Sequence, residues 1–235
     1  AYQEANELYE KGFLTSSCCP ASSPMSARPS RTLHSTFRHN LSPMAQIAKH
    51  IKRLDPGCKI VFVGLLAKKM EQKWETVSPY IDCVITFEEL QALFDARDID
   101  IASLPDEHLN NASYYGRIFA RSGGLASAVE QALREQGLYD LGDFRYKPVS
   151  CDGIRECRTA LLKASKGVLQ ENFIEGMACE SGCIGGAACL THGPKNKLDV
   201  DKYGQLAKEK TMTDAISFMI LNNPVWELTS ISDTL

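Results

Sequence analysis

This sequence lacks three features that would place a chain in a membrane, on nucleic acid or outside the cell. None of its apolar runs approaches the roughly 20 residues that are needed to cross a bilayer. Its 26 basic and 29 acidic residues give a net charge of −3, so there is no basic excess to attract nucleic acid or an anionic membrane. The amino terminus shows no signal-peptide pattern, and a start without Met is typical of a fragment. We therefore expect a cytoplasmic protein with no nucleic-acid partner and no membrane partner.

The composition that is present is typical of a globular protein with reduced thiols. The hydrophobic fraction is 44% and the charged fraction is 23%. A chain of 235 residues can form one large domain or two modest lobes, each with a core. Nine cysteines is an odd number, and no secretory signal accompanies them, so we expect thiols rather than disulfides.

The stretch from Phe173 to Pro194 combines reactive side chains with backbone freedom. It reads FIEGMACESGCIGGAACLTHGP and places Cys179 and Cys183 four residues apart. Thiolates at this spacing can reach one metal centre, and the glycines let the backbone approach a bulky inorganic ligand. Cysteine is also a common small buried residue, so metal binding and core packing both remain open for this stretch alone.

A second cysteine-rich stretch, Thr15 to Ala21, reads TSSCCPA. Two adjacent cysteines cannot easily point at the same iron atom. If one of this pair ligates a cluster, the other can do different chemistry, and a thiol suits proton transfer.

Both stretches together resemble the catalytic domain of the FeFe hydrogenases, whose signatures are TSCCP, PCxxKKxE and ExMACxxGCxxGG. The first signature is present as Ser17-Cys18-Cys19-Pro20. The third is present as Glu175, Met177-Ala178-Cys179, Gly182-Cys183 and Gly185-Gly186. The second survives only as Ala67-Lys68-Lys69-Met70-Glu71. Leu65 and Leu66 occupy the interval between the strand and the two lysines, where the family has proline and cysteine, and this interval is one residue shorter than in the family. The resemblance corresponds to the latter part of the family's catalytic domain.

The resemblance implies an α/β fold, in which parallel sheets flanked by helices form two lobes with the cluster site between them. Residues 1–113 would form the lobe with the TSSCCP and AKKME motifs, and residues 114–235 the lobe with MACESGC. The implied cofactors are a 4Fe–4S cluster and a di-iron subcluster that carries carbon monoxide and cyanide. The implied activity is the reversible, anaerobic reduction of protons to dihydrogen, with ferredoxin or another electron carrier and hydrogenase maturation proteins as partners.

The resemblance also assigns roles to single residues. Three cysteines would be metal ligands, namely Cys19, Cys179 and Cys183, and Cys183 would also bridge to the di-iron unit. Protons would pass through Cys18, Glu7 and Glu4, although the spacing of the two glutamates by itself favours a solvated acidic face. Lys68 would donate to a cyanide ligand, or would simply be a surface lysine at a helix start. The remaining implied cofactor contacts are Met177, Phe119 and the backbone of Gly123 and Gly124 at a helix N-terminus. The alternative for Phe119 is an aromatic residue of the core.

Periodicity and capping signals predict the local elements. Helices are expected over Tyr2–Lys11, Pro43–Leu54, Glu88–Ala96, Asp152–Lys166 and within Asp199–Ile220, and strands over Lys59–Gly64, Ile81–Phe87, Phe144–Val149 and Asn172–Glu175. Structural thiols are expected for Cys151, Cys157 and Cys189. Ser22–His39 shows neither the helical nor the strand period of apolar residues. We interpret it as a degenerated or frameshifted copy of the segment that follows the TSCCP signature in the family.

The missing second-signature cysteine keeps two other functions open. One is a non-catalytic iron–sulfur protein on the same scaffold, as in the nuclear prelamin A recognition factor family, which assembles clusters or binds partners. The other is a degenerate copy that binds no metal. Leucine cannot bind iron, so one cluster ligand is absent from its expected place.

Overall fold

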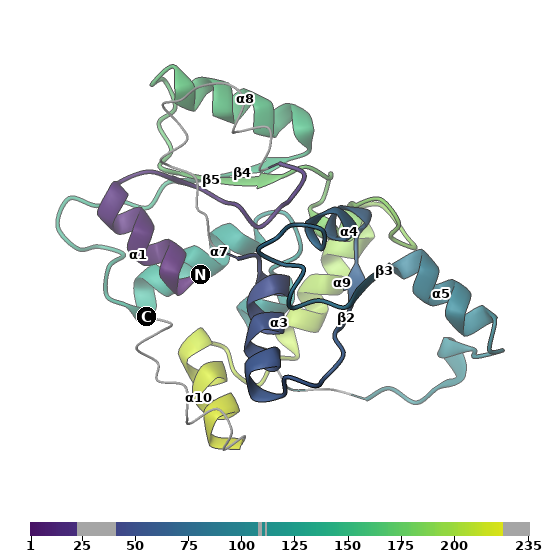
Figure 1. The fold of residues 1–235 in the computed structure, drawn as a ribbon. Helices are drawn as coiled ribbons and strands as arrows, with labels where there is room; N and C mark the ends of the chain where they lie inside the picture. Colours follow the sequence, from purple (N-terminus) through teal and green to yellow (C-terminus); the bar gives the residue numbers. More distant parts are fainter. Residues whose placement is uncertain (23–40, 108–109, 111, 223–235) are drawn as a thin grey trace.

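The computed structural model describes residues 1–22, 41–107, 110 and 112–222 (Figure 1). The segment Ser22–His39 therefore lies outside the described residues except for Ser22. The described helices are α1 (Tyr2–Lys11), α3 (Pro43–Leu54), α4 (Leu66–Glu71), α5 (Phe87–Asp95), η2 (Ile101–Ser103), α6 (Tyr114–Ile118), α7 (Gly124–Glu135), α8 (Ile154–Ser165), η3 (Cys183–Gly185), α9 (Pro194–Gln205) and α10 (Met212–Asn222). The described strands are β1 (Leu14–Thr15), β2 (Val61–Gly64), β3 (Cys83–Thr86), β4 (Pro148–Asp152) and β5 (Phe173–Met177).

The first sheet joins distant parts of the chain in the parallel order β1-β5-β4. Leu14 pairs with Phe173, and Pro148 pairs with the same residue on the other side of β5. Because all three strands run in one direction, their carboxyl ends lie at one edge of the sheet. This pairing brings the loop that follows β1, which holds Cys18, next to the loop that follows β5, which holds Cys179.

Helices cover both faces of this sheet, as Figure 1 shows. Alternate residues of β5 point to opposite faces, so Phe173 packs with α1 and α7 while Ile174 packs with α8. The core toward α1 and α7 is fully buried and includes Leu8, Leu14 and Leu133. A strand that is buried on both faces is the usual component of a parallel sheet, and all five residues of β5 are buried.

The second sheet consists of β2 and β3, which are parallel and pair from Val61 with Cys83 to Gly64 with Thr86. Helix α3 packs on it through Met44, Ala45 and Ala48, and its N-terminus is capped by the Ser42 side chain. Helices α4 and α5 begin directly after β2 and β3, so each sheet presents the carboxyl ends of its strands to a loop or helix start.

These elements confirm the predicted α/β fold, with parallel sheets flanked by helices. The predicted helices Tyr2–Lys11 and Pro43–Leu54 have the observed bounds. The strand predicted over Phe144–Val149 was wrong in its bounds, because pairing with β5 starts only at Pro148 and continues to Asp152. The division of the chain at residue 113 stays a prediction; the first sheet takes strands from both sides of it.

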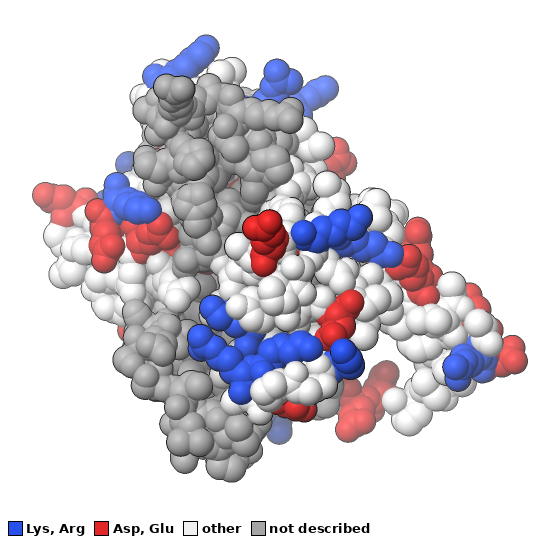
Figure 2. All heavy atoms as spheres, in the orientation of Figure 1, with Lys and Arg blue, Asp and Glu red and all other residues white. Residues whose placement is uncertain are grey.

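The surface carries both signs of charge interspersed, and Lys and Arg gather over α3 on the face in view (Figure 2). Lys52 of α3 and Lys59, which precedes β2, are paired with Asp82 at 2.9 and 3.2 Å. Within the described residues, no helix combines the length and apolarity that crossing a membrane requires.

Candidate metal centre

A cavity of about 350 Å³ lies where the carboxyl ends of both sheets meet. Gly64 ends β2 and Met177 ends β5, and both residues line it. The other lining residues come from the loops and helices that follow the strands and from α3, namely Cys18, Pro43, Met44, Ile47, Phe62, Val63, Leu65, Lys68, Phe87, Phe119, Ala120, Cys183 and Ile184. Apart from Lys68 and the two thiols, these side chains and backbone segments make an apolar wall.

Lys68 is held at this wall by a buried ion pair. Its Nζ lies 2.6 Å from a carboxylate oxygen of Glu71, which is only 1% exposed, and 3.2 Å from the carbonyl oxygen of Cys18. Lys68 is itself 9% exposed, so the alternative of a surface lysine is wrong. The hydrogen bond from Lys68 to the Cys18 carbonyl connects α4, which follows β2, to the cysteine loop that follows β1. Glu71 is thus the residue that positions Lys68.

Cys18 lies between two cavities. It lines the one just described and a second one of about 610 Å³, which is also lined by Glu4 and Ser17. Burial, followed by the nearby Glu4 carboxylate, raises the pKa of the Cys18 thiol well above its ordinary value. The thiol is therefore protonated at neutral pH in the protein without cofactors.

The two predicted proton-relay glutamates have different surroundings. Glu4 is 8% exposed and lines the second cavity beside Cys18. Glu7 lies one turn further along α1, is half-buried and forms an ion pair with Lys11. The structure brings Glu4 to Cys18, whereas Glu7 is not among the residues that line either cavity.

The three predicted ligand thiols lie close enough to influence one another. Burial raises the pKa of Cys183 to about 11; the Lys68 ammonium lowers it, and the thiols of Cys19 and Cys179 raise it further. Burial and then Cys19 raise the pKa of Cys179. Cys183 lines the 350 Å³ cavity, but Cys19 and Cys179 do not. Cys183 is therefore the one of these three thiols that reaches the cavity.

The close packing of Gly186 shows what surrounds Cys179. A Cβ atom added at Gly186 would lie 3.0 Å from the Cys179 Sγ and 2.7 Å from the Leu65 side chain. Counted back three residues from Lys68 in the signature PCxxKKxE that the sequence resembles, the expected cysteine falls at position 65, and the Leu65 side chain approaches the same backbone as Cys179. The Cys179 thiol beside this glycine, together with the neighbouring Cys19 and Cys183, fits an iron–sulfur cluster with three cysteine ligands.

No group of three potential ligands among the described residues is close enough to hold a single metal ion. A cluster differs in this respect, because each thiolate binds a different iron atom. Cysteine thiolates are the ordinary ligands of iron–sulfur clusters, so the three thiols are compatible with one.

Gly123 and Gly124 begin α7, as predicted, but the N-terminus of this helix is occupied by a protein group. The Glu175 carboxylate accepts the N–H groups of Gly123, Leu125 and Ala126 at 3.1, 3.4 and 3.1 Å and the Ser150 hydroxyl at 2.9 Å. Neither glycine is among the residues that line the 350 Å³ cavity. A cofactor contact from these glycines stays a prediction; the Gly123 N–H already donates to Glu175 and the Gly124 N–H to the Arg121 carbonyl at 2.9 Å.

Met177 and Phe119 do line the cavity, and Met177 is 2% exposed. Sequence reasoning did not identify Glu175 as the cap of α7 or Glu71 as the partner of Lys68. The spacing of a motif gives no direction for a side chain. The available signals were a glutamate within a buried strand and a glutamate three residues after a lysine, which share a helix face.

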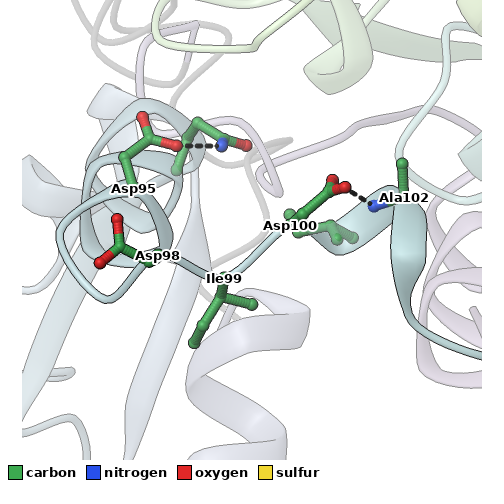
Figure 3. Close-up of a pocket in the computed structure, with 7 residues that line it drawn as sticks. Asp95, Asp98, Ile99, Asp100 and Ala102 are labelled. Carbon is green, nitrogen blue, oxygen red and sulfur yellow. Dashed lines mark hydrogen bonds between the residues drawn. The ribbon is translucent and has the colours of Figure 1, made fainter.

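A separate hollow of about 580 Å³ lies at the C-terminal end of α5. Figure 3 shows Asp95 hydrogen-bonded to Gln91, and Asp100 accepting the N–H of Ala102 at 3.0 Å. Its lining residues all fall within 91–102 and include no cysteine and no predicted site residue.

Comparisons with known proteins agree with this geometry. The model of a family described as the C-terminal domain of the iron only hydrogenase large subunit matches residues 1–187. Iron hydrogenase 1 of Clostridium pasteurianum is 30% identical over 188 residues, which cover 65% of this chain and 32% of that protein. The chain thus spans about a third of the length of this relative.

Solved structures show the same fold. A variant of the [FeFe]-hydrogenase HydA1 from Chlamydomonas reinhardtii superposes with a TM-score of 0.66 at 16% identity, over 94% of this chain and 76% of that one. A structure of HydA(deltaEFG), described as revealing stepwise assembly of the H-cluster, superposes with a TM-score of 0.61 at 17% identity, over the same shares of the two chains.

Proposed function

Because this chain belongs to the family formed by the C-terminal domain of the iron-only hydrogenases, we propose that it is an iron–sulfur oxidoreductase that reversibly reduces protons to dihydrogen. The observation that carries the proposal is the cavity at the carboxyl ends of both sheets, where Cys18, Lys68, Met177 and Cys183 meet. The family match and the fold support a cluster-binding scaffold. The reaction, the electron carrier and the maturation partners are our proposal for this chain.

Cys19, Cys179 and Cys183 would hold a 4Fe–4S cluster, and the 350 Å³ cavity would take a di-iron unit beside Cys183. When bound, these groups supply the electron transfer and the hydride chemistry, which amino-acid side chains do not perform. Lys68 would present its ammonium to anionic ligands, since Glu71 and the Cys18 carbonyl hold it at the wall. The apolar wall would exclude water.

Protons would enter through the second cavity. Glu4 and Cys18 both line it, and Cys18 also reaches the first cavity, so the thiol is placed to hold a proton at the boundary of the two. Glu7 would deliver protons to Glu4 from the half-buried side of α1. Ferredoxin or a similar carrier would supply electrons, and the hydrogenase maturation proteins would install the di-iron unit.

One observation favours a second function, that of a cluster protein without hydrogenase activity. Leu65 lies where the family's fourth cluster ligand would stand, and its side chain packs against Gly186 next to Cys179. A cluster with a missing ligand is less stable and has a shifted potential. Such a protein would bind iron and sulfide, but it would carry no di-iron unit.

The deciding experiment is an infrared spectrum of the protein co-expressed with hydrogenase maturation proteins under strict anaerobiosis. We expect bands of iron-bound carbon monoxide and cyanide, together with hydrogen production from reduced ferredoxin. The variant Cys18→Ala should keep its iron and its infrared bands but lose most of the hydrogen production, whereas Cys83→Ala, at an exposed position of β3, should keep both.

Iron and sulfide without these bands would refute the hydrogenase proposal and support the second function. A protein that binds neither iron nor sulfide would refute both.

A further inference from the structure

The cluster site needs a fourth ligand that position 65 does not supply. Leu65 is 6% exposed, and its side chain fills the space beside Gly186 and Cys179. A hydrocarbon side chain offers no lone pair to iron, and 4Fe–4S clusters are ordinarily held by four cysteines. Because cysteine thiolate is the ordinary ligand, a thiol that lies near Cys179 and Cys183 would be the most direct substitute.

Cys189 is folded back onto Cys183 by the loop between them. The Gly186 N–H donates to the Cys183 carbonyl at 3.3 Å, and the Cys189 N–H donates to the Gly186 carbonyl at 3.2 Å. The Cys189 Sγ itself lies 3.4 Å from the Cys183 carbonyl oxygen. Cys189 is 8% exposed, so its thiol lies within the loop and not at its outer surface.

The same loop is tied to the segment that contains Leu65. The Leu66 N–H approaches the Ala187 carbonyl at 3.5 Å, and the Glu88 N–H approaches the Ala188 carbonyl at 3.4 Å. Ala188 has a φ of 70°, a left-handed backbone conformation that is unfavourable for a residue with a Cβ. This unfavourable backbone turn directly precedes Cys189 and sets where its side chain begins.

The neighbouring thiols also affect the ionisation of Cys189 and Cys183. Burial and then Cys179 raise the pKa of the Cys189 thiol, and Cys189 contributes to the raised pKa of Cys183. Three of the remaining cysteines lie elsewhere: Cys151 and Cys157 are buried between β4, β5 and α8, and Cys83 is exposed on β3. Cys58 lies between α3 and β2, and Cys18 lines the 350 Å³ cavity, where it is assigned to proton transfer.

We propose that Cys189 supplies the fourth thiolate of the cluster, in place of the cysteine that is missing at position 65. The ligand set would be Cys19, Cys179, Cys183 and Cys189, and Cys189 would thus not be the structural thiol that the sequence suggests. On binding, the thiol releases its proton to solvent and its sulfur replaces the hydrogen bond to the Cys183 carbonyl with a bond to iron. The inference rests on the proposed function only in requiring a cluster at this site.

The test is anaerobic reconstitution with ferrous iron and sulfide, followed by iron analysis and electron paramagnetic resonance. We expect the wild-type protein and the control Cys83→Ser to give the signal of a reduced 4Fe–4S cluster after dithionite. Cys189→Ser should instead give the signal of an oxidised three-iron cluster and lose iron to a chelator about tenfold faster, comparable to the loss caused by removing a supporting group at a metal site. The double variant Leu65→Cys/Cys189→Ser should regain the wild-type retention.

A Cys189→Ser variant that keeps the four-iron signal and the wild-type retention would overturn the proposal and leave the proposed function intact. A wild-type protein that binds no cluster would overturn both. If circular dichroism shows that Cys189→Ser is unfolded, alkylation of the wild-type protein by iodoacetamide decides. A ligand thiol is protected in the reconstituted protein relative to the metal-depleted protein, and equal modification of Cys189 in both forms would overturn the proposal.

Discussion

Glu175 is predicted to be the most sensitive single side chain for the stability of the first sheet. It is fully buried at the centre of β5, and it accepts three backbone N–H groups at the start of α7 together with the Ser150 hydroxyl. The carboxylate thus joins β5, β4 and α7. Removing it would leave donors at a buried helix N-terminus without acceptors.

The magnitude follows from these four hydrogen bonds. A hydrogen bond to a charged group contributes about 1.5–3 kcal/mol, and each buried donor without a partner costs about 1–3 kcal/mol. Water that enters the space vacated by the carboxylate recovers part of this, so we expect Glu175→Ala to lower the free energy of unfolding by about 4 kcal/mol. Glu175→Gln keeps one acceptor oxygen but turns an NH₂ group toward the donors, and it should cost about 2 kcal/mol.

Urea unfolding of the metal-depleted protein, followed by circular dichroism, measures the effect. With a slope of about 2–3 kcal/mol/M, the midpoint of Glu175→Ala should fall by about 1.5 M. The control is Glu10→Ala, an exposed glutamate on α1, which should change stability by less than about 0.5 kcal/mol. A Glu175→Ala variant within about 1 kcal/mol of the wild type, on the order of an ordinary surface change, would refute the argument that this carboxylate organises the start of α7.

The pH dependence gives a second check. Burial raises the pKa of Glu175, while the hydroxyl of Ser150 and the three N–H groups act in the opposite direction. With a pKa above the value of 4.5 for an ordinary glutamate, the contribution of this group to stability is complete below that pH and decreases as pH rises through the folded-state pKa. Glutamine does not titrate, so the stability difference between wild type and Glu175→Gln should narrow from acid toward neutral pH.

Three further predictions concern other contacts. Lys68→Met should lower the free energy of unfolding by about 3–5 kcal/mol because it leaves the Glu71 carboxylate buried without its partner. The double variant Lys68→Met/Glu71→Leu should recover most of this loss. Urea unfolding measures both variants, and equal losses in the two would contradict the coupling between Lys68 and Glu71. Gly124→Ala should destabilise the protein by more than about 2 kcal/mol in the same assay, because the new Cβ would lie 2.1 Å from the Ile118 carbonyl oxygen. An unchanged midpoint of urea unfolding would exclude this close packing. Partial burial raises the pKa of Glu135, but hydrogen bonds led by that from the Tyr2 hydroxyl lower it to about 2. Its contribution to stability, about 1 kcal/mol, is therefore present above the ordinary pKa of 4.5 and lost as pH falls toward 2. Wild type should lose more stability than Glu135→Gln over this range, and parallel curves of unfolding free energy against pH would contradict the assignment.

The sequence by itself determined the features that depend on neighbouring residues. Helix α1 ends at Gly12 and α3 starts at Ser42 and Pro43, because capping and proline signals act locally. The two cysteine motifs likewise identified the family, since their residues are adjacent or four apart in the chain. The resemblance also indicated that Lys68, Cys18 and Cys183 belong to one site.

The tertiary structure alone decided which side chains meet. The bounds of β4 depend on its partner β5, which lies more than 20 residues away along the chain. The packing of Leu65 against Gly186, and the return of Cys189 to Cys183, depend on hydrogen bonds between the loop after β5 and the starts of α4 and α5. A period or a motif describes one segment, whereas a ligand set is fixed by the distances between segments, and these distances follow from the pairing and packing of the two sheets.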